Sequence, residues 1–196
     1  MQEPLPLANI HQAVLEFLRG RNDVVVFGAQ AVNAYVNEPR MTQDIDLLST
    51  RAAELAEELR EHLNNEFHIA VRVREIGEGR GYRLYQVQKS GNRHLVDLRP
   101  VETLPATNRI ENVLVISPAD LIASKVIAYT ERRGKPKAGT DWRDLAMLLL
   151  TFPELKSETG EVGERLKALN VGPAILDTWR DLISQDIQPE DEDDEF

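Results

Sequence analysis

The chain of 196 residues contains no cysteine, and aromatic side chains make up only 6% of the sequence. Without cysteine, thiol catalysis, disulfide frameworks and cysteine-based zinc sites are excluded, and a reducing, cytoplasmic location is expected. The histidines show no paired spacing of the kind that binds zinc from one helix, which argues against a histidine-based zinc site as well. They are His11, His62, His68 and His94.

Long apolar runs are also missing from the sequence. No stretch approaches the ~20 apolar residues that a membrane-spanning helix needs. The N-terminal residues lack a basic segment followed by an apolar run, which a secretory signal would require. We therefore expect a protein that is neither exported nor embedded in a membrane.

A general excess of positive charge is absent too. The sequence has 23 basic and 33 acidic residues, a formal net charge of −10, and residues 190–195 are all acidic. This balance disfavours general DNA binding through bulk charge. The exception is the segment from Lys125 to Arg143, where six basic residues stand against two acidic ones. Such a local excess could hold a polyanion.

The spacing of apolar residues predicts an α+β core followed by a helical C-terminal part. A good helix start is expected at Ser117 with Pro118, and Thr140 is expected to cap a later helix. Helices are expected at residues 7–19, 29–36, 51–64, 121–130 and 141–150, and strands at residues 23–27, 41–48, 68–75, 82–88, 94–98 and, as a short edge segment, 113–116. The expected organisation is a core over residues 1–116, helices packed on it over residues 117–187, and a disordered acidic tail over residues 188–196.

The most informative stretch is residues 27–48, F-G-A-Q-A-V-N-A-Y-V-N-E-P-R-M-T-Q-D-I-D-L-L. If its second half is a strand, side-chain alternation places Asp44 and Asp46 on one face, together with Arg40 and Thr42. Adjacent carboxylates repel each other unless a cation or proton compensates, so a divalent metal bound through oxygen is their natural complement. The alternative is an exposed polar strand face, because short motifs of common residues recur by accident.

Two further residues indicate the same chemistry. Gly28 follows the first strand and opens a helix, so backbone N–H groups and the positive end of the helix dipole are available for a phosphate. In a later strand Val96 and Leu98 share the core face, so Asp97 points the other way, beside the first two carboxylates. Three acids around a phosphate and a metal suggest phosphoryl transfer, with two Mg²⁺ ions and a carboxylate that assists deprotonation of an attacking hydroxyl.

With these motifs the chain resembles the nucleotidyltransferases of the DNA polymerase β superfamily, in particular the AbiEii-like toxins and minimal nucleotidyltransferases. The resemblance covers about residues 20–150, and its most specific part is Arg-x-Thr-x-Asp-Ile-Asp at residues 40–46. It implies a polymerase-β-type core, a mixed or antiparallel sheet with flanking helices. The implied activity is Mg²⁺- or Mn²⁺-dependent transfer of a nucleoside monophosphate from an NTP to a hydroxyl of RNA, protein or a small molecule. A role as the toxin of a toxin–antitoxin pair, with an antitoxin as partner, is implied as well.

The resemblance also implies roles for particular residues. Ala29 and Gln30 stand where the family has a second glycine and often a serine or threonine. This departure favours the alternative function, a non-catalytic nucleotide-binding or partner-binding module with the same fold. The implied catalytic and metal-binding residues are Asp44, Asp46 and Asp97, and the implied nucleotide-binding residues are Gly28, Ala29, Gln30, Arg40, Thr42 and Lys125.

Two later segments, residues 120–125 and 140–145, resemble the Lys and Asp motifs of this family on successive helices. By this resemblance Lys125 would meet a phosphate, and the alternative is a solvated lysine on a helix surface. Asp141 is explained equally well as a favourable partner of the helix dipole, and Asp144 as a member of an ordinary surface ion pair.

Other motifs fit less well in their context. The glycines of residues 77–81 lie between two expected strands, which favours a hairpin loop over a dinucleotide-binding turn. A haloacid-dehalogenase-like site would need an apolar strand before Asp44, where Met-Thr-Gln stands instead. The Asp-x-Asp motif of a sugar-nucleotide transferase remains an alternative, but it explains neither Gly28 nor Asp97.

Overall fold

The computed structural model describes residues 5–189 and divides into two compact units. The first unit comprises the residues up to Ala34 together with Pro39–Ile116. The second comprises Tyr35–Glu38 together with the residues from Ser117 onward. The acidic tail that we expected to be disordered lies, from position 190 onward, outside the described residues.

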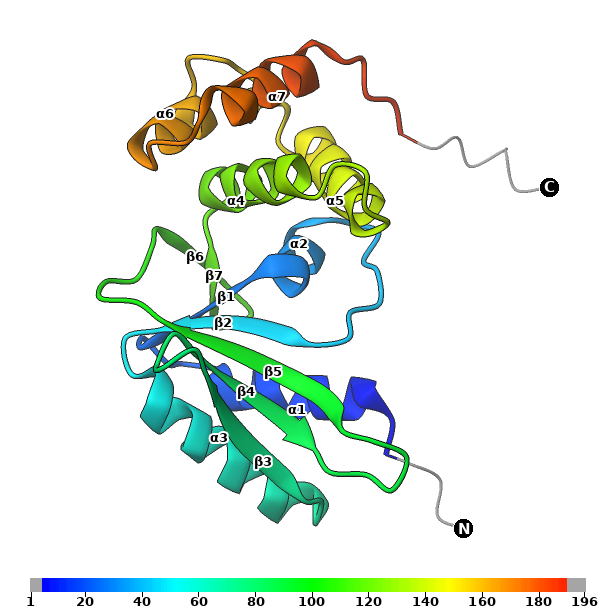
Figure 1. Cartoon of the computed structure of the whole chain (residues 1–196), viewed down its shortest axis with the longest axis vertical. Helices are drawn as coiled ribbons and strands as arrows, with labels where there is room; N and C mark the ends of the chain where they lie inside the picture. Colours follow the sequence, from blue (N-terminus) through cyan, green and yellow to red (C-terminus); the bar gives the residue numbers. More distant parts are fainter. Residues whose placement is uncertain (1–4, 190–196) are drawn as a thin grey trace, which may run out of the picture. The chain divides into compact units, whose positions relative to one another are not determined.

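Within the described residues, the first unit is built on a seven-stranded mixed sheet with the order β3-β4-β5-β2-β1-β7-β6 (Figure 1). The pairs β2–β5 and β1–β7 are parallel and the other pairs are antiparallel. This architecture confirms the predicted α+β class. The elements are α1 (Leu7–Leu18), β1 (Val24–Phe27), α2 (Gly28–Tyr35), β2 (Ile45–Ser49), α3 (Ala52–Phe67), β3 (Val71–Ile76), β4 (Gly81–Gln86), β5 (Arg93–Pro100), β6 (Thr107–Ile110) and β7 (Val113–Ile116).

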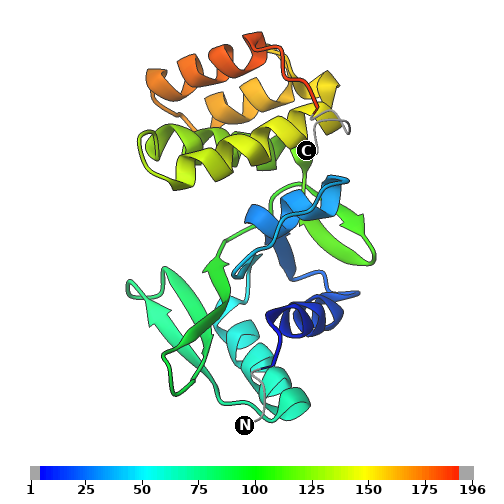
Figure 2. The same cartoon turned by 90° about the vertical axis from the view of Figure 1, so that its right-hand side faces the viewer.

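The core of this unit lies between the sheet and helices α1 and α3, which run side by side on the same face of the sheet (Figures 1 and 2). Leu55, Leu59 and Leu63 recur at helical spacing on α3 and are fully buried, as one apolar helix face requires. In β2, the side chains of Ile45 and Leu47 are buried in this core, so the side chain of Asp46 between them lies on the opposite face of the sheet.

Two sequence expectations for the sheet need correction, and one strand was not expected. The strand expected at residues 41–48 begins only at Ile45, because its pairing with β1 extends only from Asp46 to Ser49. The segment expected at the sheet edge, β7, lies between β1 and β6, and β6 was not predicted. The β6 sequence Thr-Asn-Arg-Ile is mostly polar, so it lacks the apolar pattern from which a strand is predicted, although an edge strand can carry polar residues. The glycine-rich segment 77–81 joins β3 to β4, as predicted.

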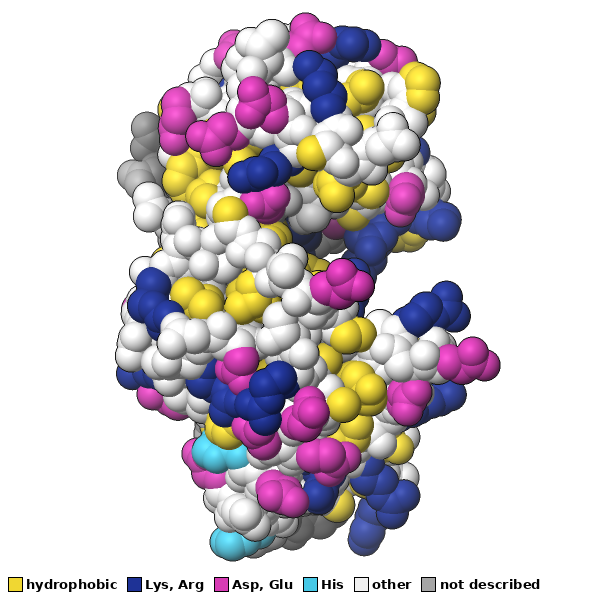
Figure 3. All heavy atoms as spheres, turned by 90° about the vertical axis from the view of Figure 1, so that its left-hand side faces the viewer, with side chains coloured by type: hydrophobic (Ala, Val, Ile, Leu, Met, Phe, Trp, Pro, Cys, Tyr) yellow, Lys and Arg dark blue, Asp and Glu magenta, His cyan; other side chains and the backbone are white. Residues whose placement is uncertain are grey.

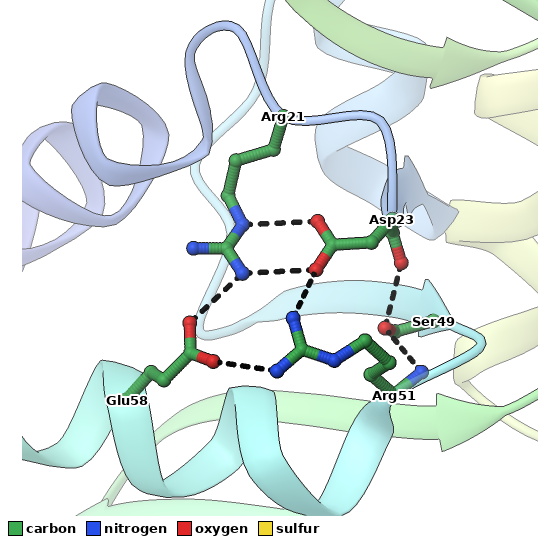
Figure 4. Close-up of polar contacts among 5 residues, drawn as sticks. All are labelled: Arg21, Asp23, Ser49, Arg51 and Glu58. Atoms are coloured by element: carbon green, nitrogen blue, oxygen red, sulfur yellow. Dashed lines mark hydrogen bonds and ion pairs between the residues drawn. The ribbon is translucent and has the colours of Figure 1, made fainter.

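An ion-pair network ties β1 and β2 to α3 at the start of β1 (Figure 4). Nε and Nη2 of Arg21 donate to the two carboxylate oxygens of Asp23, at 3.0 and 2.9 Å, and Nη2 also donates to Glu58 at 2.8 Å. Arg51 joins the same two carboxylates at 3.1 Å each. The hydroxyl of Ser49 donates to the Asp23 carbonyl at 2.7 Å and so links the end of β2 to the start of β1. These contacts lie at the ends of β1 and β2 that are farthest from Gly28.

The second unit consists of helices, and its first helix begins where the sequence predicts. Ser117 caps α4, since its hydroxyl oxygen accepts from the Asp120 N–H at 3.2 Å, and Pro118 is the first helical residue. Thr140 is not a cap as expected, because α5 already begins after Pro136, and Thr140 lies within it. The helices are α4 (Pro118–Glu131), α5 (Lys137–Thr151), the short 3₁₀ helix η1 (Pro153–Leu155), α6 (Glu161–Ala168) and α7 (Pro173–Ser184).

The charged surface is mixed in sign. On the face drawn in Figure 3, acidic and basic side chains stand close together rather than in separate blocks. This pattern agrees with the charge balance of the sequence, which disfavours binding of polyanions through bulk charge. Within residues 5–189, no helix combines the length and hydropathy that crossing a bilayer requires.

Candidate active site

The turn from β1 into α2 carries the first element of the candidate site. Gly28 adopts a positive φ of 69°, a conformation that glycine reaches without steric cost. A Cβ atom at this position would collide with the carboxylate of Asp46. The close approach of this helix start to Asp46 therefore requires glycine, and it brings the positive end of α2 next to a carboxylate.

Asp46 and Asp97 lie side by side on neighbouring strands. In the parallel pairing of β2 with β5, the register places Asp46 opposite Asp97. The residues that flank each of them in its strand are buried in the core, so both carboxylates point to the other face of the sheet. The alternation that predicted this orientation of Asp97 also explains it in the structure.

Asp97 is also paired with Arg83, which faces it from β4 on its other side. The guanidinium of Arg83 donates to both carboxylate oxygens of Asp97, at 2.8 and 3.1 Å. Burial favours the neutral acid, but the hydrogen bond from Arg83 and the neighbouring His94 outweigh it, so the pKa of Asp97 is lowered. The same pair raises the pKa of Arg83. Asp97 is therefore an anion at neutral pH.

Asp44 lies in the irregular segment before β2, not on the strand as predicted. His94 lies between Asp44 and Asp97. Its Nδ1 is 3.1 Å from Oδ2 of Asp44, and its Nε2 is 3.0 Å from Oδ1 of Asp97. One ligand atom from each of these three residues can be chosen so that all lie within 4.8 Å of one another. Asp44, His94 and Asp97 could therefore hold a metal ion together.

The segment that carries Asp44 is anchored to α2. The side-chain amide of Asn33 donates to the carbonyl of Arg40 at 2.8 Å and accepts from the N–H of Arg40 at 3.0 Å. The hydroxyl of Thr42 donates to Oε1 of Gln30 at 3.4 Å. These contacts replace the strand pairing that the sequence predicted for residues 41–44, and they fix the route of the chain to Asp44.

A cleft of about 420 Å³ opens between α1, α2 and this segment. Three residues with an implied role in nucleotide binding, Gln30, Arg40 and Thr42, line it together with His11 of α1. Burial lowers the pKa of His11, against the opposing effects of the Asp44 charge and the Gln43 carbonyl. His11 is therefore neutral at physiological pH and adds no charge to the cleft.

Lys125 belongs to the second unit and is neither exposed nor solvated. Its ammonium lies 2.6 Å from Oδ2 of Asp144 and 3.6 Å from Oδ1 of Asp141. Asp141 also accepts from Arg132 at 2.8 Å. The surface alternatives for Lys125 and Asp144 are thus wrong, since the two residues are only 8% and 0% exposed. Two residues of the basic segment neutralise buried acids, so less of its charge is available to a polyanion.

Sequence reasoning missed three residues around the carboxylates. Arg83 is found only from strand register, since it is opposite Asp97 across the β4–β5 pair. Asn33 lies on the helix after Gly28, and its spacing alone does not show that its amide meets the backbone of Arg40. His94 precedes Asp97 by three residues, a spacing that regular strand alternation assigns to the opposite face.

Several solved structures share this fold. The Megavirus polyadenylate synthase matches with a TM-score of 0.60 at 15% identity, over 75% of this chain and 32% of that one. JHP933 from Helicobacter pylori matches with a TM-score of 0.57 at 13% identity, over 92% and 90% of the two chains. This chain thus spans about a third of the polyadenylate synthase. No curated protein matches in sequence. At these identities the likeness defines the fold, that of the nucleotidyltransferases.

The sequence also matches a family profile along most of its length. Residues 13–194 fit the family described as nucleotidyl transferase AbiEii toxin, type IV toxin–antitoxin system. The chain therefore belongs to the AbiEii nucleotidyltransferase toxin family. This membership confirms the resemblance drawn from the Arg-x-Thr-x-Asp-Ile-Asp motif.

Proposed function

We propose that this chain is a metal-dependent nucleotidyltransferase, which transfers a nucleoside monophosphate from an NTP to an acceptor hydroxyl. The observation that carries the proposal is the turn at Gly28, where α2 starts against the carboxylate of Asp46. A helix N-terminus attracts phosphate oxygens, and a carboxylate attracts the cation that accompanies a triphosphate. The group that attracts phosphate and the group that attracts its cation thus lie at the same turn.

The donor set fits a hard divalent cation. Mg²⁺ and Mn²⁺ prefer oxygen ligands. Asp46 and Asp97 are opposite each other in the β2–β5 pair, and ligand atoms of Asp44 and Asp97 lie within 4.8 Å of each other. We assign Asp44, Asp46 and Asp97 to a metal site for two ions, as two-metal phosphoryl transfer uses. When bound, a divalent ion neutralises charge on the phosphates and favours displacement at phosphorus.

The other residues of the turn would orient the substrate. Backbone N–H groups of Gly28, Ala29 and Gln30 are the proposed phosphate contacts, and Arg40 and Thr42 are the proposed contacts to the nucleotide in the cleft beside them. In the reaction the acceptor oxygen bonds to the α-phosphorus, and the bond to the bridging oxygen breaks so that pyrophosphate leaves.

The proton of the acceptor hydroxyl needs a base. Asp97 is the proposed proton acceptor as well as a metal ligand, but its low pKa makes it a weak base and a good ligand. We therefore expect its contribution to metal binding to exceed its contribution to proton transfer.

The acceptor and the partner follow from the family. Because the family is that of type IV toxins, we propose that the chain is the toxin of a pair, with an antitoxin as its partner and with RNA, a protein or a small molecule as acceptor. Expression of the chain should then arrest growth, and the change Asp44→Asn should abolish the arrest at equal protein level. Growth arrest by that variant would count against a catalytic toxin.

A labelled-NTP transfer assay tests the activity directly. The full chain is incubated with each labelled NTP, Mg²⁺ or Mn²⁺, and RNA, protein or aminoglycoside-like acceptors, and pyrophosphate release is followed in parallel. The variants Asp44→Asn and Asp46→Asn should lose release, whereas Glu54→Gln, which removes an exposed carboxylate from α3, should not. Equal release from the wild type and both aspartate variants would refute the assignment.

The bidentate contact of Arg83 with Asp97 favours a second function, a non-catalytic nucleotide-binding module. In such a module Arg83 would neutralise Asp97 permanently, so that no metal is needed there. Ala29 and Gln30, which supply no hydroxyl at the turn, agree with it. Nucleotide binding that is independent of metal, together with absent pyrophosphate release under all acceptors, would favour the module over the enzyme.

A further inference from the structure

His94 reaches the carboxylates because β5 is irregular. The pairing of β5 with β4 shifts register next to Leu95, which lies between the paired residues His94 and Val96. Leu95 and Val96 are both fully buried, although they are consecutive in a strand. A β-bulge of this kind shifts the alternation of side chains by one residue. His94 and Asp97 therefore lie on the same face of the sheet, whereas regular alternation would place them on opposite faces.

The imidazole of His94 is held between two acids. Nε2 lies 3.0 Å from Asp97, whose two oxygens already accept from Arg83, and Nδ1 lies 3.1 Å from Asp44. Histidines that bind metals commonly donate the second ring N–H to a carboxylate, which fixes the ring and its tautomer. The contact of Nε2 with Asp97 matches this supporting bond and leaves Nδ1 on the side of Asp44.

We propose that Nδ1 of His94 is a ligand of the ion held by Asp44, while Asp97 supports the ring through Nε2 and belongs with Asp46 to the second ion. This makes His94 a residue that determines metal preference. Adjacent ligands of an octahedral ion with bonds of ~2.1 Å lie roughly 3.0 Å apart. The distance of 3.1 Å between Nδ1 and the Asp44 oxygen is close to this separation, so the two atoms are near enough to bind one ion. This inference rests on the metal site of the proposed function.

A nitrogen ligand changes which ion the site prefers. Mg²⁺ is a hard cation that takes oxygen ligands and gives up its water reluctantly, whereas Mn²⁺ suits carboxylates and, as a first-row transition metal, also accepts an imidazole. We therefore expect the site to prefer Mn²⁺ to Mg²⁺. A site of carboxylates alone would discriminate less between the two.

Pulsed electron paramagnetic resonance of the full chain, loaded with one equivalent of Mn²⁺ and no nucleotide, tests the ligand. The wild type should show the modulation of a directly bound ¹⁴N nucleus, and His94→Gln should lose it. Titration should show that His94→Gln weakens Mn²⁺ binding on the order of tenfold or more. Mg²⁺ binding, measured by competition, should weaken less, because its ligands are oxygens.

Two histidine variants serve as controls. His62→Gln removes an imidazole on α3 and should keep the nitrogen signal. His11→Gln should keep it too, although His11 lies near Asp44. Loss of the signal in His11→Gln but not in His94→Gln would overturn the assignment.

The experiment separates this inference from the proposed function. If Mn²⁺ binds and Asp44→Asn abolishes binding, but the wild type lacks the nitrogen signal, the role of His94 is wrong while the carboxylate site stands. If Mn²⁺ binding is absent or insensitive to Asp44→Asn, the proposed metal site itself fails.

Discussion

Replacing Lys125 by methionine should destabilise the helical unit strongly. Lys125 lies 2.6 Å from Asp144, and the side chains of the pair are 9% and 0% exposed. Removing one partner of a buried pair leaves a charge without its cation, which typically costs 3–5 kcal/mol. Asp141 keeps its contact with Arg132, so only one acid loses its cation. We therefore expect a loss of about 3 kcal/mol in the free energy of unfolding.

Tryptophan fluorescence makes this measurement specific to one unit. The two tryptophans of the chain, Trp142 and Trp179, lie on α5 and α7, so their emission during denaturant unfolding reports the helical unit. The matched control is Lys167→Met, which removes an exposed lysine from α6 and should change stability by less than about 0.5 kcal/mol.

A double variant distinguishes the structural role of Lys125 from a phosphate contact. Lys125→Met combined with Asp144→Leu removes both charges and should recover most of the lost stability, because apolar pairs often replace buried ion pairs without cost. If the double variant is stable but binds NTP much more weakly, the phosphate role is supported. If Lys125→Met costs less than about 1 kcal/mol, the argument from burial is refuted.

Three further outcomes are expected. Gly28→Ala should shift Asp46 and require a strained φ, so it should weaken Mn²⁺ binding measured by titration; unchanged affinity would contradict the close approach. Asn33→Ala removes two hydrogen bonds and should cost about 1–3 kcal/mol in denaturant unfolding and also weaken Mn²⁺ binding, and an effect on stability alone would show that Asn33 does not position Asp44. The contact with Arg21 lowers the pKa of Asp23, so its stabilisation is present at neutral pH and is lost as the pH falls below about 4; an equally steep acid loss in Asp23→Asn would exclude this pair as the cause.

Much of the first unit could be predicted because its signals are local. The β-branched run before Gly28 predicts a buried strand, and glycine at its end predicts the turn into a helix. Alternation of Val96 and Leu98 is enough to orient Asp97. The register that sets Asp97 beside Asp46 and opposite Arg83 depends on contacts between distant segments, so one sequence does not contain it.

Burial of charge was harder to foresee than the positions of the strands along the chain. Lys125 and Asp144 are nineteen positions apart and are on different helices, so each looks like a surface residue when its own helix is considered alone. Their burial follows from pairing across α4 and α5, because each charge offsets the desolvation of the other. Asp44 shows a related difficulty, since Asn33 holds its segment in place of the strand pairing that alternation suggested.

The case of His94 shows that a broken pattern can itself be a signal. The segment His94-Leu-Val-Asp97 has two apolar residues between two polar ones, which strict alternation cannot place with both apolar side chains in the core. Either one apolar residue is exposed or the strand contains a bulge, and burial of both Leu95 and Val96 selects the bulge. Once the bulge is required, both polar residues must turn to the same face. Where both apolar residues of a polar–apolar–apolar–polar segment are buried in a strand, its two polar side chains therefore lie on the same face of the sheet.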